Sequence, residues 1–197
     1  MLREIDEKLI APDRLLKSSD MAKLGCNNCK GCSDCCRDRA SIITLDPYDI
    51  RLLKDGLNYS FEGLIDRGIV VLSVTDGIVL PGLGTSTDEK DQCILLGEDG
   101  RCTVHEFRPG ICRMFPLARL WHEDGTFSYF LQEGECLRSN GVKIRISKWL
   151  GYPDIKGYEE FIRSYHDALS SLKAEMTADL SIEEQVSLQR EFLSVWF

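Results

Sequence analysis

The chain has 197 residues, of which 43% are hydrophobic, and its formal net charge is −8 at pH 7. This length and apolar content suit one larger domain, or one domain with an appendage. The acidic balance disfavours nucleic acid and anionic membrane surfaces as partners, because both bind basic faces. No apolar run approaches the roughly 20 residues of a membrane-spanning helix. The first ten residues also lack the apolar stretch of a secretory signal, so we expect a cytoplasmic protein.

The N-terminal segment is predicted to be helical but interrupted. Apolar residues recur at helical spacing from Leu2, and Pro12 ends or restarts the pattern. We interpret residues 1–25 as a helical clip that leads into a cysteine-rich loop with little regular structure.

Two helices are predicted after this loop. Asp46 suits a helix N-cap, Pro47 suits the first helical position, and Gly56 would lie just past the end. A shorter helix is expected from Ser60 to about Arg67.

Three hairpins are predicted next. The first turns at Asp76-Gly77, a pair suited to a type I′ turn. The second turns around residues 98–100, and the third has residues 122–125 at its tip. Between the last two, Pro109 is expected to start one helical turn.

The C-terminal part is predicted to be helical. Residues 147–150 suit a short helix closed by Gly151, and apolar residues then recur at helical spacing between Tyr158 and Leu172. Ser181 and Glu184 form the capping box of a last helix. This tail contains no cysteine, and its expected role is packing on the rest of the chain or on a partner.

The chain has nine cysteines, and five of them fall in the segment GCNNCKGCSDCCRD. A disulfide framework would leave one thiol over and does not fit a reducing cytosol. Buried apolar cysteines do not fit a segment that is otherwise polar. Metal coordination is therefore the favoured interpretation.

The cysteine spacing suits an iron–sulfur cluster better than zinc. Structural zinc sites use paired C-x2-4-C knuckles, whereas a C-x2-C-x2-C run surrounds one face of a [4Fe–4S] cluster that a remote cysteine completes. Cys29, Cys32 and Cys35 have that triple spacing. The remote cysteines are too far apart for knuckles, which predicts ligands on separate strands and turns. Eight of the nine thiols would supply one large or two ordinary centres, and the spacing leaves open whether Cys26 or Cys36 is the spare thiol.

Arginines near the cysteines would offset the negative charge of a thiolate ligand set. Arg108 and Arg113 lie in the tight RPGICR turn and are the predicted cofactor-binding residues, whereas surface exposure is an equally good interpretation of Arg37 and Arg101. His105 is acceptable as a ligand by spacing, but a hydrogen-bonded turn histidine is favoured.

The expected fold class is α+β. We predict a small irregular metal-centred domain with short β-hairpins and helices over residues 26–150, between the N-terminal clip and a helical extension over residues 151–197.

The stretches CKGCSDCCRD, LDPYDIRLL and CILLGEDGRCTVHEFRPGICRMFPL resemble the cysteine-cluster proteins of the YkgJ type, whose CxxCxxCC domain is labelled zinc- or iron-chelating. The resemblance covers about residues 26–140. It implies eight metal ligands, in a first motif of Cys29, Cys32, Cys35 and Cys36, a second motif of Cys93, Cys102 and Cys112, and a later cysteine at Cys136. Arg108, Pro109, Arg113 and Pro116 stand at the RP and CR-x-FP positions of the family. A related branch resembles flagellin lysine N-methylase, but this chain is shorter and its first motif is spaced differently.

These observations predict a cytoplasmic protein whose cysteines hold an iron–sulfur centre of the [4Fe–4S] type. Its task would be electron transfer or a cluster-assisted modification of another protein. The alternatives are a structural zinc module for protein binding and an S-adenosylmethionine-dependent lysine N-methyltransferase. The expected partner is another protein, and no catalytic residue is assigned.

Overall fold

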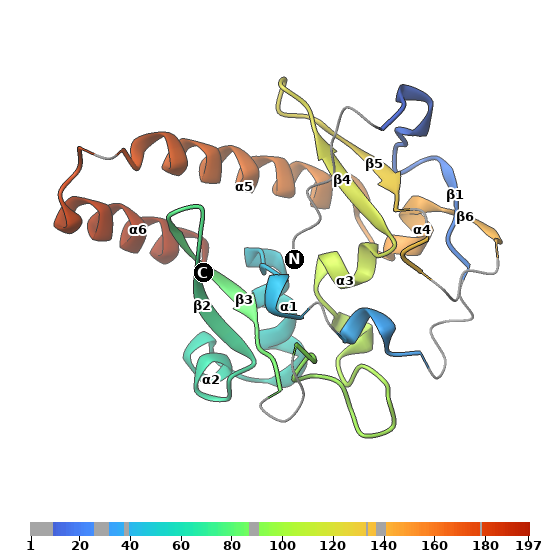
Figure 1. Ribbon diagram of the computed structural model, residues 1–197, viewed down its shortest axis with the longest axis horizontal. Helices are drawn as coiled ribbons and strands as arrows, with labels where there is room; N and C mark the ends of the chain where they lie inside the picture. Colours follow the sequence, from blue (N-terminus) through green and yellow to red (C-terminus); the bar gives the residue numbers. More distant parts are fainter. Residues whose placement is uncertain are drawn as a thin grey trace.

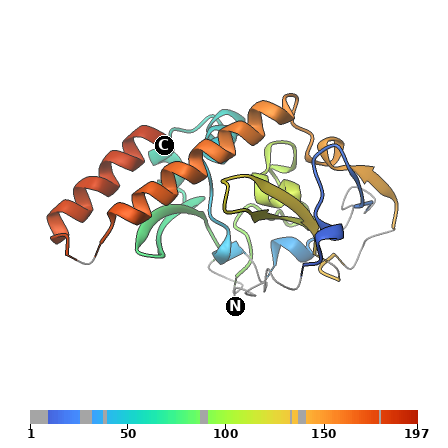
Figure 2. The same cartoon turned by 90° about the horizontal axis from the view of Figure 1, so that it is seen from above.

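The structure is a computed structural model that describes residues 10–25, 32–37, 40–86, 91–132, 134–136, 141–177 and 179–197. Within these residues it contains six α-helices and three two-stranded antiparallel sheets, which confirms the predicted α+β class. The two long C-terminal helices form an antiparallel pair that extends to one side of the molecule (Figures 1 and 2).

The N-terminal clip is not helical over its described part. Residues Pro12–Arg14 form one 3₁₀ turn, and β1 (Met21–Lys23) pairs with β6 (Lys143–Arg145) in an antiparallel sheet. The helical prediction was therefore wrong there, because the partner strand is about 120 residues away in sequence and leaves no local signal. Residues 1–9 lie outside the described residues.

Helix α1 (Pro47–Leu57) begins as predicted but ends later. Asp46 accepts a hydrogen bond from the backbone of Asp49 in a capping box, and the left-handed Asn58 ends the helix. The predicted end at Gly56 was wrong. Gly56 instead allows a close approach, since a Cβ there would lie 2.6 Å from Cγ of Phe107.

The next elements match their predictions. Helix α2 (Phe61–Asp66) is capped by Ser60, and β2 (Val70–Thr75) pairs with β3 (Ile78–Leu83). The turn residues Asp76 and Gly77 have φ of 50° and 80°, as a type I′ turn requires.

The third hairpin and the short helix after it are also confirmed. Strand β4 (Leu117–Trp121) pairs with β5 (Phe127–Leu131), and α4 (Ile146–Leu150) ends at Gly151 in the left-handed conformation.

The C-terminal helices are part of the core. Helix α5 (Ile155–Glu175) packs its first half against the β4–β5 hairpin and α4, through buried residues such as Tyr158 and Ile162. Its second half and α6 (Ile182–Trp196) bury Leu172 and Phe192 against β3. The division into three units stays a prediction.

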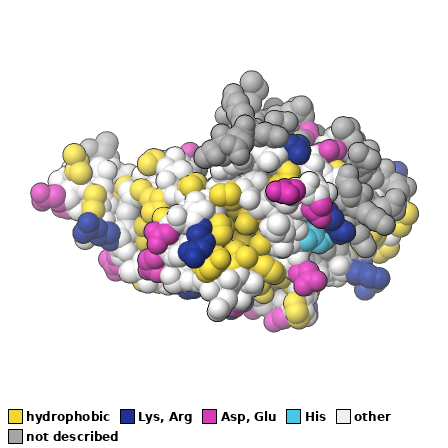
Figure 3. All heavy atoms as spheres, turned by 90° about the horizontal axis from the view of Figure 1, so that it is seen from below, with side chains coloured by type: hydrophobic (Ala, Val, Ile, Leu, Met, Phe, Trp, Pro, Cys, Tyr) yellow, Lys and Arg dark blue, Asp and Glu magenta, His cyan; other side chains and the backbone are white. Residues whose placement is uncertain are grey.

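No helix among the described residues is long and apolar enough to cross a membrane. On the face seen from below, hydrophobic side chains gather over the middle, and the basic side chains drawn there are scattered among acidic ones (Figure 3).

Candidate metal centre

Six cysteines from three segments of the chain line one cavity of about 70 Å³. This volume is several times the roughly 10–15 Å³ that a single water molecule requires. The cysteines are Cys32, Cys35, Cys36, Cys93, Cys102 and Cys112. All of them are free thiols.

Backbone hydrogen bonds join the first cysteine segment to the second. The 3₁₀ turn Asp34–Cys36 carries two of the thiols. The backbone N–H of Cys93 donates to the carbonyl of Cys36 at 2.8 Å, and Ser41 N–H donates to the Asp91 carboxylate at 2.7 Å. Residues separated by 50 or more positions are thereby held side by side.

A tight loop brings Cys102 back beside Cys93, as the second predicted hairpin required. Leu96 and Cys102 form an isolated β-bridge, and Gly97 N–H donates to the Arg101 carbonyl at 2.8 Å. The loop closes without extended strands.

Cys112 is positioned by helix α3 (Gly110–Met114) and by a buried carboxylate of α1. The Asp49 carboxylate accepts a hydrogen bond from Gly110 N–H at 2.6 Å. Burial, and then the charge of Asp46, raise the pKa of Asp49 well above its usual range. The sequence predicted no role for Asp49 in positioning Cys112. Its place at the third position of the α1 capping box was the one signal that its carboxylate forms hydrogen bonds.

The remainder of the cavity wall is largely apolar. Trp149, which sequence reasoning also missed, donates its ring N–H to the Met114 carbonyl at 3.3 Å. Such a wall excludes water and strengthens electrostatic interactions inside the cavity. The apolar lining residues are Ile43, Leu83, Leu95, Val104, Pro109, Phe115 and Trp149.

Five of the six thiols influence one another's pKa values. A hydrogen bond from Cys36 lowers the pKa of Cys35 to about 7 and raises that of Cys36. Burial raises the pKa of Cys93 to about 11 and also raises the pKa values of Cys102 and Cys112. Because metal ligands must be thiolates, binding a cation here would release protons.

Backbone hydrogen bonds lower the pKa of Cys35, Cys93 and Cys102. After burial, the largest influences on the pKa of Cys93 and Cys102 are backbone hydrogen bonds that lower it, from Leu95 to Cys93 and from Val104 to Cys102. Amide hydrogen bonds to cysteine sulfur stabilise the thiolate, and in iron–sulfur proteins they tune the reduction potential.

Two arginines and a histidine lie at the cavity. Arg101, His105 and Arg108 line it, and Arg108 donates to the His105 carbonyl at 2.7 Å. Burial, and then the charge of Arg108, lower the pKa of His105, so the cations are the two arginines. Arg113 is not among the lining residues. Its guanidinium donates to the carbonyls of Glu106 and Leu150 and lies over the ring of Tyr152.

The cavity gathers six of the eight predicted metal ligands. Cys29 lies outside the described residues, as does Cys26. Cys136 is a free thiol that is not among the lining residues, so its role stays a prediction. In the described part of the chain, no three cysteine, histidine or acidic side chains are grouped closely enough to hold a metal ion as they lie. The donor set nevertheless fits a thiolate-bound centre, because the thiols share one cavity with cations and amide donors.

Residues 28–137 match the family model "CxxCxxCC: Putative zinc- or iron-chelating domain". The match covers more than half of the chain and includes all six cysteines of the cavity. This protein belongs to the CxxCxxCC family of metal-binding domains. No curated protein and no solved structure matches the chain.

Proposed function

We propose that this is a cytoplasmic protein whose cysteine cavity holds an iron–sulfur centre of the [4Fe–4S] type. Its task would be electron transfer or cluster-assisted modification of another protein. The observation that carries the proposal is that six thiols, from three segments, line one apolar cavity. A [4Fe–4S] centre and a tetrahedral zinc ion each take four thiolates, so the number of thiols does not separate them. The C-x2-C-x2-C run of the first segment, with the other cysteines on separate segments, favours the cluster.

The chain's own residues have clear tasks in this proposal. A [4Fe–4S] centre supplies one-electron chemistry when bound. The thiolates would hold it, and Arg101 and Arg108 would offset part of their negative charge. Trp149 and Phe115 would exclude water, and amide N–H groups would stabilise the sulfurs of Cys93 and Cys102.

A structural zinc module is the second candidate, because the family description includes zinc. Metal binding would then supply folding free energy and no redox chemistry. The two candidates differ in whether the bound metal can be reduced.

The test is a reductive titration of protein purified without oxygen. We expect absorbance of the cluster that bleaches on addition of dithionite, together with an EPR signal of the reduced cluster. A colourless protein that binds zinc and shows no change under dithionite would replace the first candidate by the second. Saturable S-adenosylmethionine binding would point instead to methyl transfer.

A further inference from the structure

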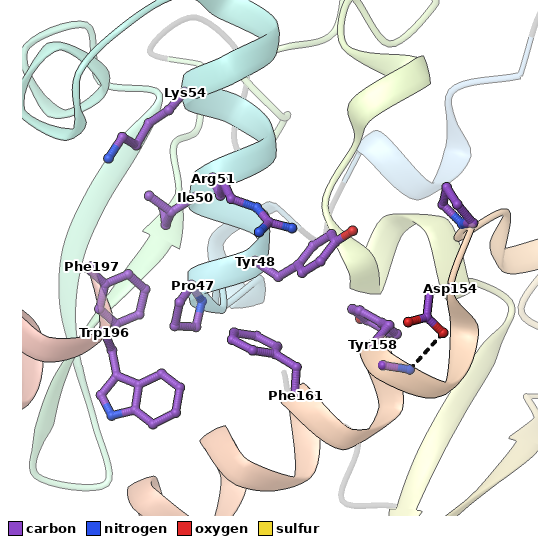
Figure 4. A pocket seen from close by; sticks show the side chains of 12 residues that line it. Pro47, Tyr48, Ile50, Arg51, Lys54, Asp154, Tyr158, Phe161, Trp196 and Phe197 are labelled. Atoms are coloured by element: carbon purple, nitrogen blue, oxygen red, sulfur yellow. Dashed lines mark hydrogen bonds between the residues drawn. The ribbon is translucent and has the colours of Figure 1, made fainter.

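A second cavity lies between α1, the start of α5 and the end of α6, away from the cysteines. Its volume is about 630 Å³, within the range of small-molecule sites in proteins. Five of its twelve lining residues are aromatic, and two cations, Arg51 and Lys54, line it from α1 (Figure 4). We define this aromatic groove by its lining residues Pro47, Tyr48, Ile50, Arg51, Lys54, Pro153, Asp154, Gly157, Tyr158, Phe161, Trp196 and Phe197.

The aromatic wall is rigid before any ligand arrives. The Tyr48 ring contacts Tyr158 and Phe161 edge to face, with ring centroids 5.2 and 5.9 Å apart. Phe161 contacts Trp196 in the same way at 6.1 Å. Each such pair contributes stability beyond its buried area. The groove therefore offers half-buried ring faces at little ordering cost, which favours binding of a flat or elongated apolar body.

The charge of the groove selects an anion. Arg51 and Lys54 both line the groove from α1, and Figure 4 shows the Arg51 guanidinium directed toward Tyr48 and the Lys54 side chain extending to the other side of the helix. Within the described residues neither forms an ion pair, and Arg51 lies over the Tyr48 ring at 4.4 Å. The one acidic lining residue, Asp154, caps α5 by accepting the Gly157 N–H at 3.0 Å, and its single negative charge leaves the two cations in excess. Two cations beside an apolar wall are complementary to a carboxylate on an apolar body.

We propose that the aromatic groove binds a small organic anion that has an aromatic or aliphatic body and a carboxylate head. The body would lie against Tyr48, Phe161 and Trp196, and the carboxylate would meet Arg51 or Lys54, one on each side of α1. This site contains none of the cysteines, so it is independent of the metal centre.

The test is calorimetric titration of the full chain with four probes. These are 2-naphthylacetate and decanoate, each paired with its neutral amide. The proposal expects at least one acid to bind about tenfold more tightly than its amide, since a hydrogen bond to a charged group contributes roughly 1.5–3 kcal/mol. Preference for naphthylacetate would identify an aromatic ligand, and preference for decanoate a lipid-like one.

Paired variants locate the binding. The double variant Arg51→Gln, Lys54→Gln should lose the preference for the acid and keep the affinity for the amide. The control Lys156→Gln, Arg190→Gln removes two exposed cations outside the groove and should bind as the unmodified chain does.

Three outcomes would overturn the proposal. The first is equal binding of acid and amide, and the second is unchanged binding by the double variant. The third is no binding of any probe at about 1 mM, and this result would overturn the proposal even if a second copy of the chain were found to cover the groove. None of these outcomes depends on the metal content of the protein.

Discussion

The cysteine cavity and the aromatic groove lie on the same scaffold but are built in different ways. Loops and single helical turns carry the thiols, and scattered backbone hydrogen bonds hold these segments together. The groove is formed by three regular helices whose aromatic side chains contact one another directly. Aromatic packing therefore stabilises the groove without a ligand. The thiols of the cavity repel one another once ionised, so a bound cation would stabilise the cavity.

The largest expected effect is loss of the metal centre on removal of one lining thiol. Cys93 is the most buried of the six, with 6% of its surface exposed. Cys93→Ala should bind less than about a tenth of the metal of the unmodified chain, because loss of a ligand from a closed thiolate site costs several kcal/mol. Metal content after desalting measures it.

Cys136→Ala is the matched control for that variant. The sequence predicts Cys136 as a ligand, but it is not among the residues that line the cavity. We therefore expect the Cys136→Ala variant to retain its metal content. Complete loss of metal would instead establish Cys136 as a ligand and would show that the cavity, as described, is incomplete.

Metal removal should affect the two regions unequally. The chain stripped by a chelator should melt at a lower temperature, because a ligand that binds only the folded state stabilises it. The helices α5 and α6 should persist, since they are held by apolar packing. Circular dichroism at 222 nm should therefore change little before melting. A stripped chain without helical signal would show that the groove also depends on the metal.

A smaller effect is expected where α1 meets the loop before Cys112. Gly56→Ala should destabilise the protein by about 1–3 kcal/mol, because the added methyl group meets the Phe107 ring. Gly63→Ala in α2 is the control, since its Cβ would have ordinary contacts of 3.4 Å or more. There the higher helix propensity of alanine should leave stability unchanged or raise it. Urea denaturation of both variants measures the difference, and equal destabilisation would contradict this account.

The smallest effect concerns the ion pair between the β2–β3 turn and α5. Lys173 donates to the Asp76 carboxylate at 2.8 Å, and this bond lowers the pKa of Asp76 from 3.8. Its contribution to stability is thus present above pH 3.8 and is lost as pH falls through the lowered pKa. Lys173→Met should slightly lower the melting temperature at pH 7 and make no difference near pH 2. A difference that persists at pH 2 would assign the effect to packing.

The helices and hairpins were predictable because their signals are local. Asp46 with Pro47, Asp76 with Gly77, and Ser181 with Glu184 each specify a cap or turn within a few residues. Strand β1 was not predictable, because its pairing with β6 depends on residues far away in sequence. The helix end predicted at Gly56 was wrong because this glycine is required by the close approach of Phe107, which is a tertiary contact.

The site was predictable in its residue types and only partly in its geometry. Spacing and the family resemblance predicted Cys32, Cys35, Cys36, Cys93, Cys102 and Cys112 as metal ligands but left open whether they form one centre or two. The structure places all six around one cavity. Spacing could not reveal that Asp49 holds the helix of Cys112, or that Arg113 is directed to backbone carbonyls. Such roles depend on which buried groups meet after folding.

The central claim is that these thiols hold a polynuclear iron–sulfur centre, and composition tests it most directly. Iron, zinc and acid-labile sulfide should be measured per chain on protein purified without oxygen. The account predicts about four iron and four sulfide per chain, as a [4Fe–4S] centre contains. One zinc per chain with no sulfide would contradict it.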